Sequence, residues 1–204
     1  MNFTELLAEV YGITNRPDLV TLTKSAVKAA TLKAHTLDYF SKDIYETGIL
    51  FPTAAYFQSL DYIGLYSNWR ALRYLRRVTD ENDQNGTFLE MIVPEDVVDQ
   101  YGRNRTDIMY SAGRVIEIRS SVSFQYALIG AYVFPIVTDS GYSSWIADMH
   151  PYAIIFEACR VLFRAVGLLE ESNSFQDLLE PKDPRAPPGE YARVRMTGLV
   201  DVGT

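Results

Sequence analysis

The chain of 204 residues contains one cysteine and two histidines, and this scarcity excludes several kinds of site. Cys159 has no second thiol with which to form a disulfide inside the chain. His35 and His150 lie far apart, and no cluster of histidine and cysteine has the spacing of metal ligands. We therefore expect no disulfide framework, no metal and no other cofactor.

The usual motifs of catalysis are also missing. The sequence has no GxxxxGK phosphate-binding loop, and residues 141–144, Gly-Tyr-Ser-Ser, lack the second glycine of a nucleophile elbow. The adjacent acidic pairs Glu95/Asp96 and Glu170/Glu171 fall in loops or helix ends, where carboxylates are usually solvated. We predict a structural or interaction protein with no catalytic residue. The alternative is a hydrolase whose acidic residues come from distant parts of the chain.

No segment has the length and apolar character that crossing a membrane requires. The longest apolar run, residues 126–137, contains Pro135 and is too short to span a bilayer. The N-terminal residues include early acidic side chains, unlike a signal peptide. A formal net charge of −7 argues against binding nucleic acid through bulk charge. We expect a soluble, reduced protein, inside a cell or in a virion, with no membrane partner.

Residues 145–170 give the clearest helical pattern. Pro151 suits the first turn of a helix, where its missing N–H costs nothing. Apolar residues recur at steps of three and four and so share one face; they are Ile154, Ile155, Ala158, Cys159, Leu162, Val166 and Leu169. Glu157 and Arg160 belong to a narrow polar stripe, and Gly167 marks the end. Because a helix that is apolar over most of its circumference needs several neighbours, we expect the other helices to pack on this one.

Two helices are predicted before residue 40. The first ends at Gly12, and the second runs from about residue 18 to residue 35 with an apolar side rich in alanine. Lys24 and Lys28 line the opposite side of the second helix. We select these two lysines as candidate contacts with an acidic partner or a neighbouring subunit.

From about residue 39, strand and turn signals replace helical spacing for roughly a hundred residues. Strands are predicted over residues 44–51, 55–63, 69–78, 88–93 and 123–137, with a short helix over 94–101. A hairpin is predicted over 107–119, turning near Ala112-Gly113.

The strand over residues 69–78 is rich in arginine, at Arg70, Arg73, Arg76 and Arg77. Trp69 and Tyr74 lie between these arginines, as they would in a surface for single-stranded nucleic acid. The acidity of the chain favours a different interpretation, in which the arginines pair with carboxylates. Arg70, Arg73 and Arg76 remain candidate contacts with a subunit or partner.

Residues 181–204 contain four of the nine prolines and support no core of their own. We expect an extended C-terminal arm that becomes ordered against another chain. Its candidate contact residues are Pro181, Arg185, Tyr191, Val194, Met196, Leu199 and Val200.

The predicted fold class is α+β. Residues 1–40 and 144–180 form a helical bundle, residues 41–143 form an inserted antiparallel β-rich subdomain, and residues 181–204 form the extended arm.

Three stretches of the chain resemble the head-to-tail adaptor (connector, or tail-tubular) proteins of tailed bacteriophages. They are FTELLAEVYGITNRPDLVTLTKSAVKAATLKAH near the start, MIVPEDVVDQYG in the middle and HPYAIIFEACRVLFRAVGL near the end. The resemblance covers roughly residues 1–180. It lies in the order of the elements and in short stretches, and it includes no catalytic motif.

This resemblance implies a virion protein of the neck, assembled in the host cytoplasm. Its partners would be the portal protein, a downstream tail or nozzle protein, and further copies of itself in a ring of about twelve. Double-stranded DNA would pass through the ring without specific binding, and the segment from Pro181 to Thr204 would dock against the portal. The alternative in the same class is another tail, nozzle or baseplate protein that binds a tail component instead of a portal.

Overall fold

The computed structural model describes residues 1–65, 67–80, 83 and 86–199, and it divides the chain into two compact units. The first, called here the helical unit, comprises Met1–Asp43 together with the chain from Phe134 onward. The second, called here the β unit, is the continuous segment Ile44–Val133. Each unit has a hydrophobic core of its own.

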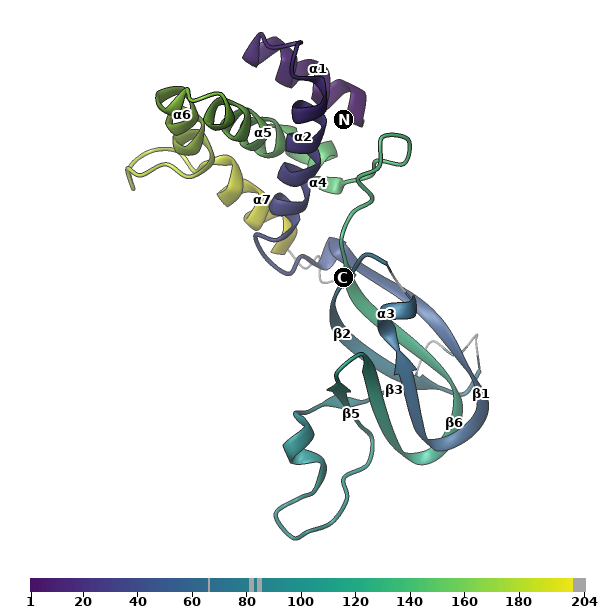
Figure 1. The fold of residues 1–204 in the computed structure, drawn as a ribbon. Helices are drawn as coiled ribbons and strands as arrows, with labels where there is room; N and C mark the ends of the chain where they lie inside the picture. The colour runs from purple at the N-terminus through teal and green to yellow at the C-terminus, as the bar shows by residue number, and fades with distance from the viewer. Residues whose placement is uncertain (66, 81–82, 84–85, 200–204) are drawn as a thin grey trace. The chain divides into compact units, whose positions relative to one another are not determined.

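The helical unit is built from both ends of the chain (Figure 1). Its elements are α1 (Phe3–Thr14), α2 (Val20–His35), the short 3-10 helix η1 (Ser41–Asp43), α4 (Trp145–Met149), α5 (Pro151–Ala165), α6 (Leu169–Leu179) and α7 (Glu190–Leu199). Asn2 begins α1 with a capping box, because its side chain accepts the Glu5 N–H while Glu5 accepts the Asn2 N–H.

Helix α5 lies at the centre of this core. Ile154, Ile155 and Ala158 are completely buried, and Pro151 is its first residue, as the sequence predicts. The predicted continuous helix over 145–170 is interrupted at His150, which separates α4 from α5. The far end of the predicted apolar face is exposed at Leu169, because the chain turns at Gly167 with a φ of 83° and begins α6.

The predicted helical bundle is wrong. Bundle helices run nearly parallel or antiparallel, whereas α2 and α5 cross each other at a steep inclination (Figure 1). Small side chains allow this crossing, since α2 buries Ala26, Ala30 and Ala34 in the shared core. The sequence pattern identified apolar faces correctly but contained no information on the angle at which the helices meet.

The predicted extended C-terminal arm is also wrong. Residues 190–199 form α7, and Tyr191 and Val194 lie in the core of the helical unit. Gly198 packs so closely on Phe40 that a Cβ at this position would overlap the aromatic ring. The prolines that indicated an arm occupy only the loop between α6 and α7, where they do not interrupt a helix.

The β unit is one six-stranded sheet with the order β3-β2-β6-β5-β4, and β1 pairs with β6. The strands are β1 (Ile44–Asp61), β2 (Trp69–Val78), β3 (Thr87–Phe88), β4 (Glu90–Met91), β5 (Ile108–Ala112) and β6 (Val115–Val133). A single helical turn, α3 (Tyr62–Leu65), follows β1, and the 3-10 helix η2 (Pro94–Val97) follows β4.

The sheet is mixed and nearly closes into a barrel, which corrects the prediction of an antiparallel section. β4 and β5 are parallel, while the other strand pairs are antiparallel. The long strands β1 and β6 stay paired through a bend. At this bend the register of their pairing shifts, between Leu50 and Phe57 of β1. This bend joins the two predicted strands over 44–51 and 55–63 into one. The predicted hairpin near Ala112-Gly113 is confirmed, with Gly113 at a φ of 66°.

One close contact fixes the outer face of this sheet. Tyr74 on β2 and Glu46 on β1 are both in register with Gly130 on β6. The Tyr74 ring lies directly over Gly130, and its hydroxyl donates to Glu46 Oε2 at 2.5 Å. Glycine is required here because any side chain on residue 130 would occupy the position of the ring.

Candidate docking surfaces

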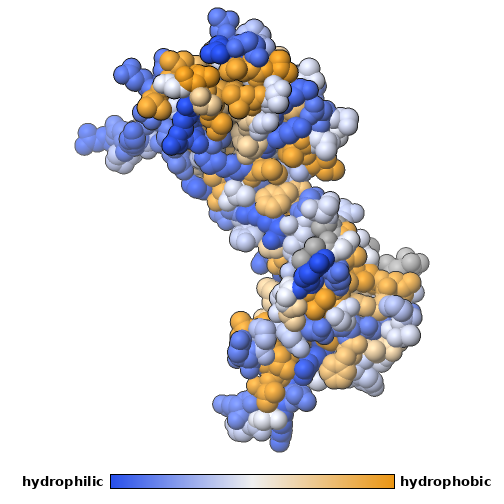
Figure 2. Space-filling model, viewed as in Figure 1, coloured by the Kyte–Doolittle hydropathy of each residue, from blue (hydrophilic) through white to orange (hydrophobic). Residues whose placement is uncertain are grey.

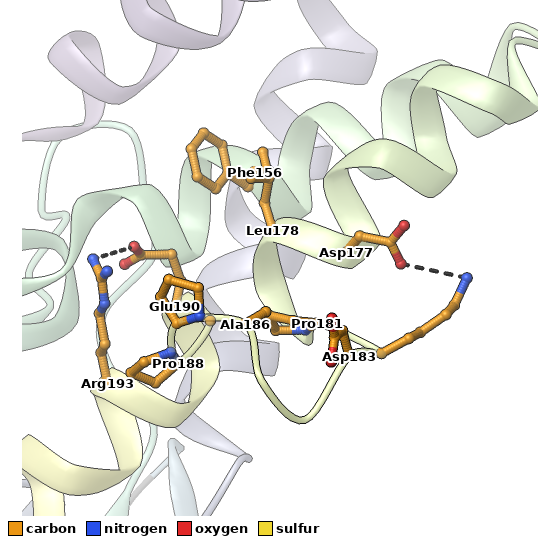
Figure 3. Close-up of a pocket in the computed structure, with 12 residues that line it drawn as sticks. Phe156, Asp177, Leu178, Pro181, Asp183, Ala186, Pro188, Glu190 and Arg193 are labelled. Carbon is orange, nitrogen blue, oxygen red and sulfur yellow. Dashed lines mark hydrogen bonds and ion pairs between the residues drawn. The ribbon is translucent and has the colours of Figure 1, made fainter.

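The loop between α6 and α7 forms one wall of a groove of about 530 Å³ in the helical unit. Figure 3 shows Phe156 and Leu178 on one side and Pro181, Ala186 and Pro188 on the other. Charged pairs lie at its rim, with Asp177 to Lys182 at 3.3 Å and Glu190 to Arg193 at 2.9 Å. The groove therefore combines an apolar floor with salt-bridged edges, which suits an apolar side chain of a partner.

The predicted arm residues are divided among different environments. Pro181 lines the groove, and Arg185 is exposed in the loop. Tyr191 and Val194 are buried and therefore unavailable to a partner. Met196 and Leu199 are 55% and 53% exposed on the outer side of α7. Val200 lies outside the described residues.

A buried carboxylate explains why α7 is held in place. Glu157 on α5 is only 2% exposed, although the sequence pattern placed it in the narrow polar stripe of its helix. Its carboxylate accepts hydrogen bonds from Lys33 on α2 at 2.9 Å, from Arg160 at 2.7 and 2.8 Å, and from the Tyr191 hydroxyl on α7 at 2.9 Å. Three helices are thus tied to one side chain.

The pKa shifts at this site agree with its geometry. Burial alone would raise the pKa of Glu157, but hydrogen bonds from Arg160, Lys33 and Tyr191 together lower it below its usual value. Burial and the neighbouring Glu157 charge raise the pKa of Tyr191 well above its usual range. Tyr191 therefore acts as a neutral hydrogen-bond donor to an ionised carboxylate.

Lys24 and Lys28 meet an acidic group of the same chain. Both pair with Asp139, at 2.8 and 2.6 Å, in the segment between the β unit and α4. Hydrogen bonds from these lysines lower the pKa of Asp139 to about 2. All three side chains are partly solvent-exposed, so the cluster lies at the surface.

The arginines of β2 have several different surroundings. Arg76 pairs with Glu46 at 2.7 Å, and its guanidinium lies over the ring of Phe88 at 5.5 Å. Arg77 pairs with Asp107 at 2.7 Å. Arg73 is exposed, and Arg70 is half-buried beside Trp69 on the wall of a hollow in the β unit.

The structure also brings together three residues that sequence reasoning did not connect. His35 ends α2, Asp43 lies in η1, and Ser144 caps α4. His35 Nδ1 lies 2.8 Å from Asp43 Oδ1, and Nε2 lies 2.9 Å from Ser144 Oγ. A carboxylate only accepts, so Nδ1 of a neutral His35 carries the proton and Ser144 donates to Nε2. This is the connectivity of a serine-hydrolase triad.

The burial and other bonds of this cluster indicate a structural role. Ser144 is 5% exposed, and its Oγ also accepts the Ala147 N–H at the start of α4. Asp43 Oδ1 also accepts a hydrogen bond from Trp145 Nε1 at 2.7 Å. The cluster therefore connects the residues just before the β unit with those that follow it. No sequence signal links positions 35, 43 and 144.

Comparisons of the chain with protein-family models and with curated proteins give no match. Within the described part of the chain, no helix is long and apolar enough to span a membrane. In the same residues, no three histidine, cysteine or acidic side chains converge as metal ligands would.

Proposed function

We propose that the protein is a head-to-tail adaptor of a tailed bacteriophage, which forms a ring beneath the portal and carries the next tail component. The observation that carries this proposal is the insertion of a complete β unit, Ile44–Val133, between segments that share one helical core. This order of elements supports the resemblance of the helical stretches to adaptor sequences.

The distribution of charge supports a conduit through which DNA passes without binding. The chain has a net charge of −7, so its overall field repels phosphates. Many basic groups are already paired within the chain: Lys24 and Lys28 with Asp139, Arg76 with Glu46, and Arg77 with Asp107. Such pairs leave less positive charge to hold a DNA backbone.

In this proposal, the exposed side of α7 contacts the portal in place of an extended arm. Met196 and Leu199 are apolar and more than half exposed, next to the buried residues that fix the helix. A flexible arm loses conformational entropy when it binds. A helix face that is already held by its own core does not pay this further cost on binding.

Native mass spectrometry of the protein with the portal encoded beside it tests the proposal. We expect a discrete complex with about one copy per portal subunit. The double variant Met196→Asp with Leu199→Asp should lose this complex, because it places charges in the contact. Leu169→Asp is the matched control, since Leu169 is 60% exposed on α6 and should not affect binding.

Two results would contradict the proposal. The first is a folded, monodisperse protein that forms no complex with the portal. The second is a complex with a tail or nozzle protein only, which would identify the chain as a different tail component.

Hydrolysis is the second candidate function, and the Ser144–His35–Asp43 arrangement is the observation that favours it. A fluorophosphonate probe reacts with serines activated in this way. We expect no labelling, because Ser144 is buried and caps α4. Labelling of the native protein that disappears in Ser144→Ala would instead support an enzyme.

A further inference from the structure

The β unit has the composition of a protein-binding surface. Residues 44–133 contain eight arginines and no lysine, and they hold nine of the 14 tyrosines in the chain. Arginine and tyrosine are enriched in protein interfaces, and lysine is depleted there. Figure 2 shows apolar side chains gathered among hydrophilic ones around β5 and the segment before it. The composition and the surface both indicate a docking module.

The segment before β5, residues 92–107, is an ordered loop and is called here the acidic loop. Asp99 Oδ1 accepts the N–H groups of Tyr101 and Arg103, both at 2.8 Å. A bridge between Val98 and Asn104 and a φ of 77° at Gly102 close its tip. Figure 1 shows this loop extending beyond β5. Several internal hydrogen bonds therefore hold the tip in one conformation.

The loop presents one aromatic side chain at its tip, beside the exposed Arg103, and two exposed acidic side chains near its start. Tyr101 is 77% exposed, and Glu95 and Asp96 are exposed on η2. Val93 and Val98 are also about half exposed. A rigid aromatic residue with a few apolar and charged neighbours is typical of an interface anchor.

A hollow of about 250 Å³ lies on the same unit, by the end of β5 and the start of β2, and Met91, the residue directly before the acidic loop, is on its wall. It is called here the aromatic hollow. Tyr62, Trp69, Arg70, Met91 and Tyr110 are among the residues on its wall. The rings of Tyr62 and Trp69 contact each other with centroids 4.8 Å apart. The Tyr62 hydroxyl donates to Gly113 O at 3.1 Å, which brings the turn carrying Arg114 beside the hollow.

We propose that the acidic loop of one copy docks into the aromatic hollow of a second copy of this chain. Tyr101 enters the hollow, where Trp69 and Tyr62 offer aromatic contacts. Glu95 and Asp96 then lie near Arg70 and Arg114. The loop carries a net negative charge and exposes its anchor, whereas the aromatic hollow has Arg70 on its wall and Arg114 in the neighbouring turn, so the two surfaces are complementary in charge.

The contact joins two different surfaces, so a linked pair retains a free hollow on the first copy and a free loop on the second. Unless the copies are related by a two-fold axis that exchanges their loops, such a contact generates a ring or a filament. The inference rests on the proposed adaptor ring and names the contact that would join neighbouring subunits. The charge pairs also make the contact weaker at high salt.

Cysteine cross-linking tests the contact directly. Cys159 is fully buried, and burial raises the pKa of its thiol to about 12, so it does not compete for oxidation. One preparation carries Gln100→Cys, an exposed position beside the anchor Tyr101, and the other carries Ala71→Cys, which lies on the wall of the hollow. Mild oxidation of the mixture should give a covalent dimer. A chain with both substitutions should give a ladder of longer oligomers.

Two controls make the result specific. Ser174→Cys places an exposed thiol on α6 of the helical unit, and it should cross-link to Ala71→Cys at least about tenfold more slowly. Adding Glu95→Arg and Asp96→Arg to the preparation with the loop cysteine should slow the cross-linking. Adding Arg114→Glu to the preparation with Ala71→Cys should then restore part of the cross-linking rate. Equal rates for the cysteines at 100 and 174 would overturn the proposed contact.

The same preparations separate this contact from the adaptor function. A portal complex without cross-linking would refute the loop-and-hollow contact and leave the adaptor function standing. Cross-linked ladders without any portal complex would support the contact and refute the adaptor function.

Discussion

Replacing Tyr191 with alanine is expected to lower the free energy of unfolding of the helical unit by about 3–5 kcal/mol. The change removes a buried ring from the core and a hydrogen bond from the carboxylate of Glu157. It also removes the ring over which the Lys33 ammonium lies at 5.4 Å. Because α7 has few other attachments of this size, the helix should detach from the unit.

Chemical denaturation followed by Trp145 fluorescence measures this effect. Trp145 belongs to the helical unit and contacts Phe40 and His35, so a Trp69→Phe background leaves one reporter of that unit. Tyr191→Phe keeps the ring and loses the hydroxyl, and should cost only about 1–3 kcal/mol. Leu199→Ala, on the exposed side of α7, should change stability by less than about 0.5 kcal/mol.

Because residues 190–199 form α7 in the core and not an extended arm, truncation of the C-terminus should lower the stability of the helical unit. An extended arm could be removed without harm, whereas removal of residues 181–204 here takes away Tyr191, Val194 and the Gly198 contact with Phe40. The shortened chain should unfold at a markedly lower denaturant concentration. A truncated chain as stable as the full one would show that α7 adds nothing to the core.

Replacing Gly130 with valine is expected to destabilise the β unit by about 1–3 kcal/mol. The new side chain would occupy the position of the Tyr74 ring, so the ring must move and its hydrogen bond to Glu46 is lost. Hydrogen exchange of β6 amides, read by mass spectrometry, should become faster.

Gly48→Val is the matched control for this change. Gly48 also lies on a strand that pairs with β6, but a Cβ there would meet only Leu128 Cδ2 at 3.9 Å, an ordinary contact distance. We expect little change in exchange. The double variant Gly130→Val with Tyr74→Ala should be less unstable than the sum of the single changes, because the clash is removed with the ring. Additive effects would mean that the ring is not the obstacle.

Local sequence signals predicted local structure well. Pro151 begins α5, the apolar spacing from Ile154 to Leu162 is buried, and Gly113 forms the β5–β6 turn. These features depend on backbone preferences and on the period of a helix or strand. The crossing of α2 and α5 depends on how two surfaces fit together, which periodicity does not report.

The errors at the C-terminus have a specific cause. The prolines at 181–188 are typical of an arm, and they obscured the helical spacing of Tyr191, Val194 and Gly198 that follows them. Glu157 was assigned to a narrow polar stripe of its helix, and a carboxylate is rarely buried without partners. Its partners, Lys33 and Tyr191, come from segments 124 and 34 residues away.

The candidate docking surfaces were predicted less well than the fold elements. Lys24, Lys28 and Arg76 were chosen for their charge, but each is paired with a carboxylate of its own chain. The aromatic hollow combines residues from α3, β2, β4, β5 and β6, so only the folded sheet assembles it. Tyr101 was visible in the sequence, but its exposure depends on the Asp99 hydrogen bonds that order the loop.

The division of the helical unit between Met1–Asp43 and the chain after Phe134 affects the order of events during synthesis. The ribosome releases the N-terminal segments first. All strands of the β unit emerge before α5, so this unit can fold while the apolar faces of α1 and α2 are still uncovered. The helical core is complete only when Tyr191 and Val194 have left the ribosome, so the apolar faces of α1 and α2 stay uncovered for longer than the core of the β unit.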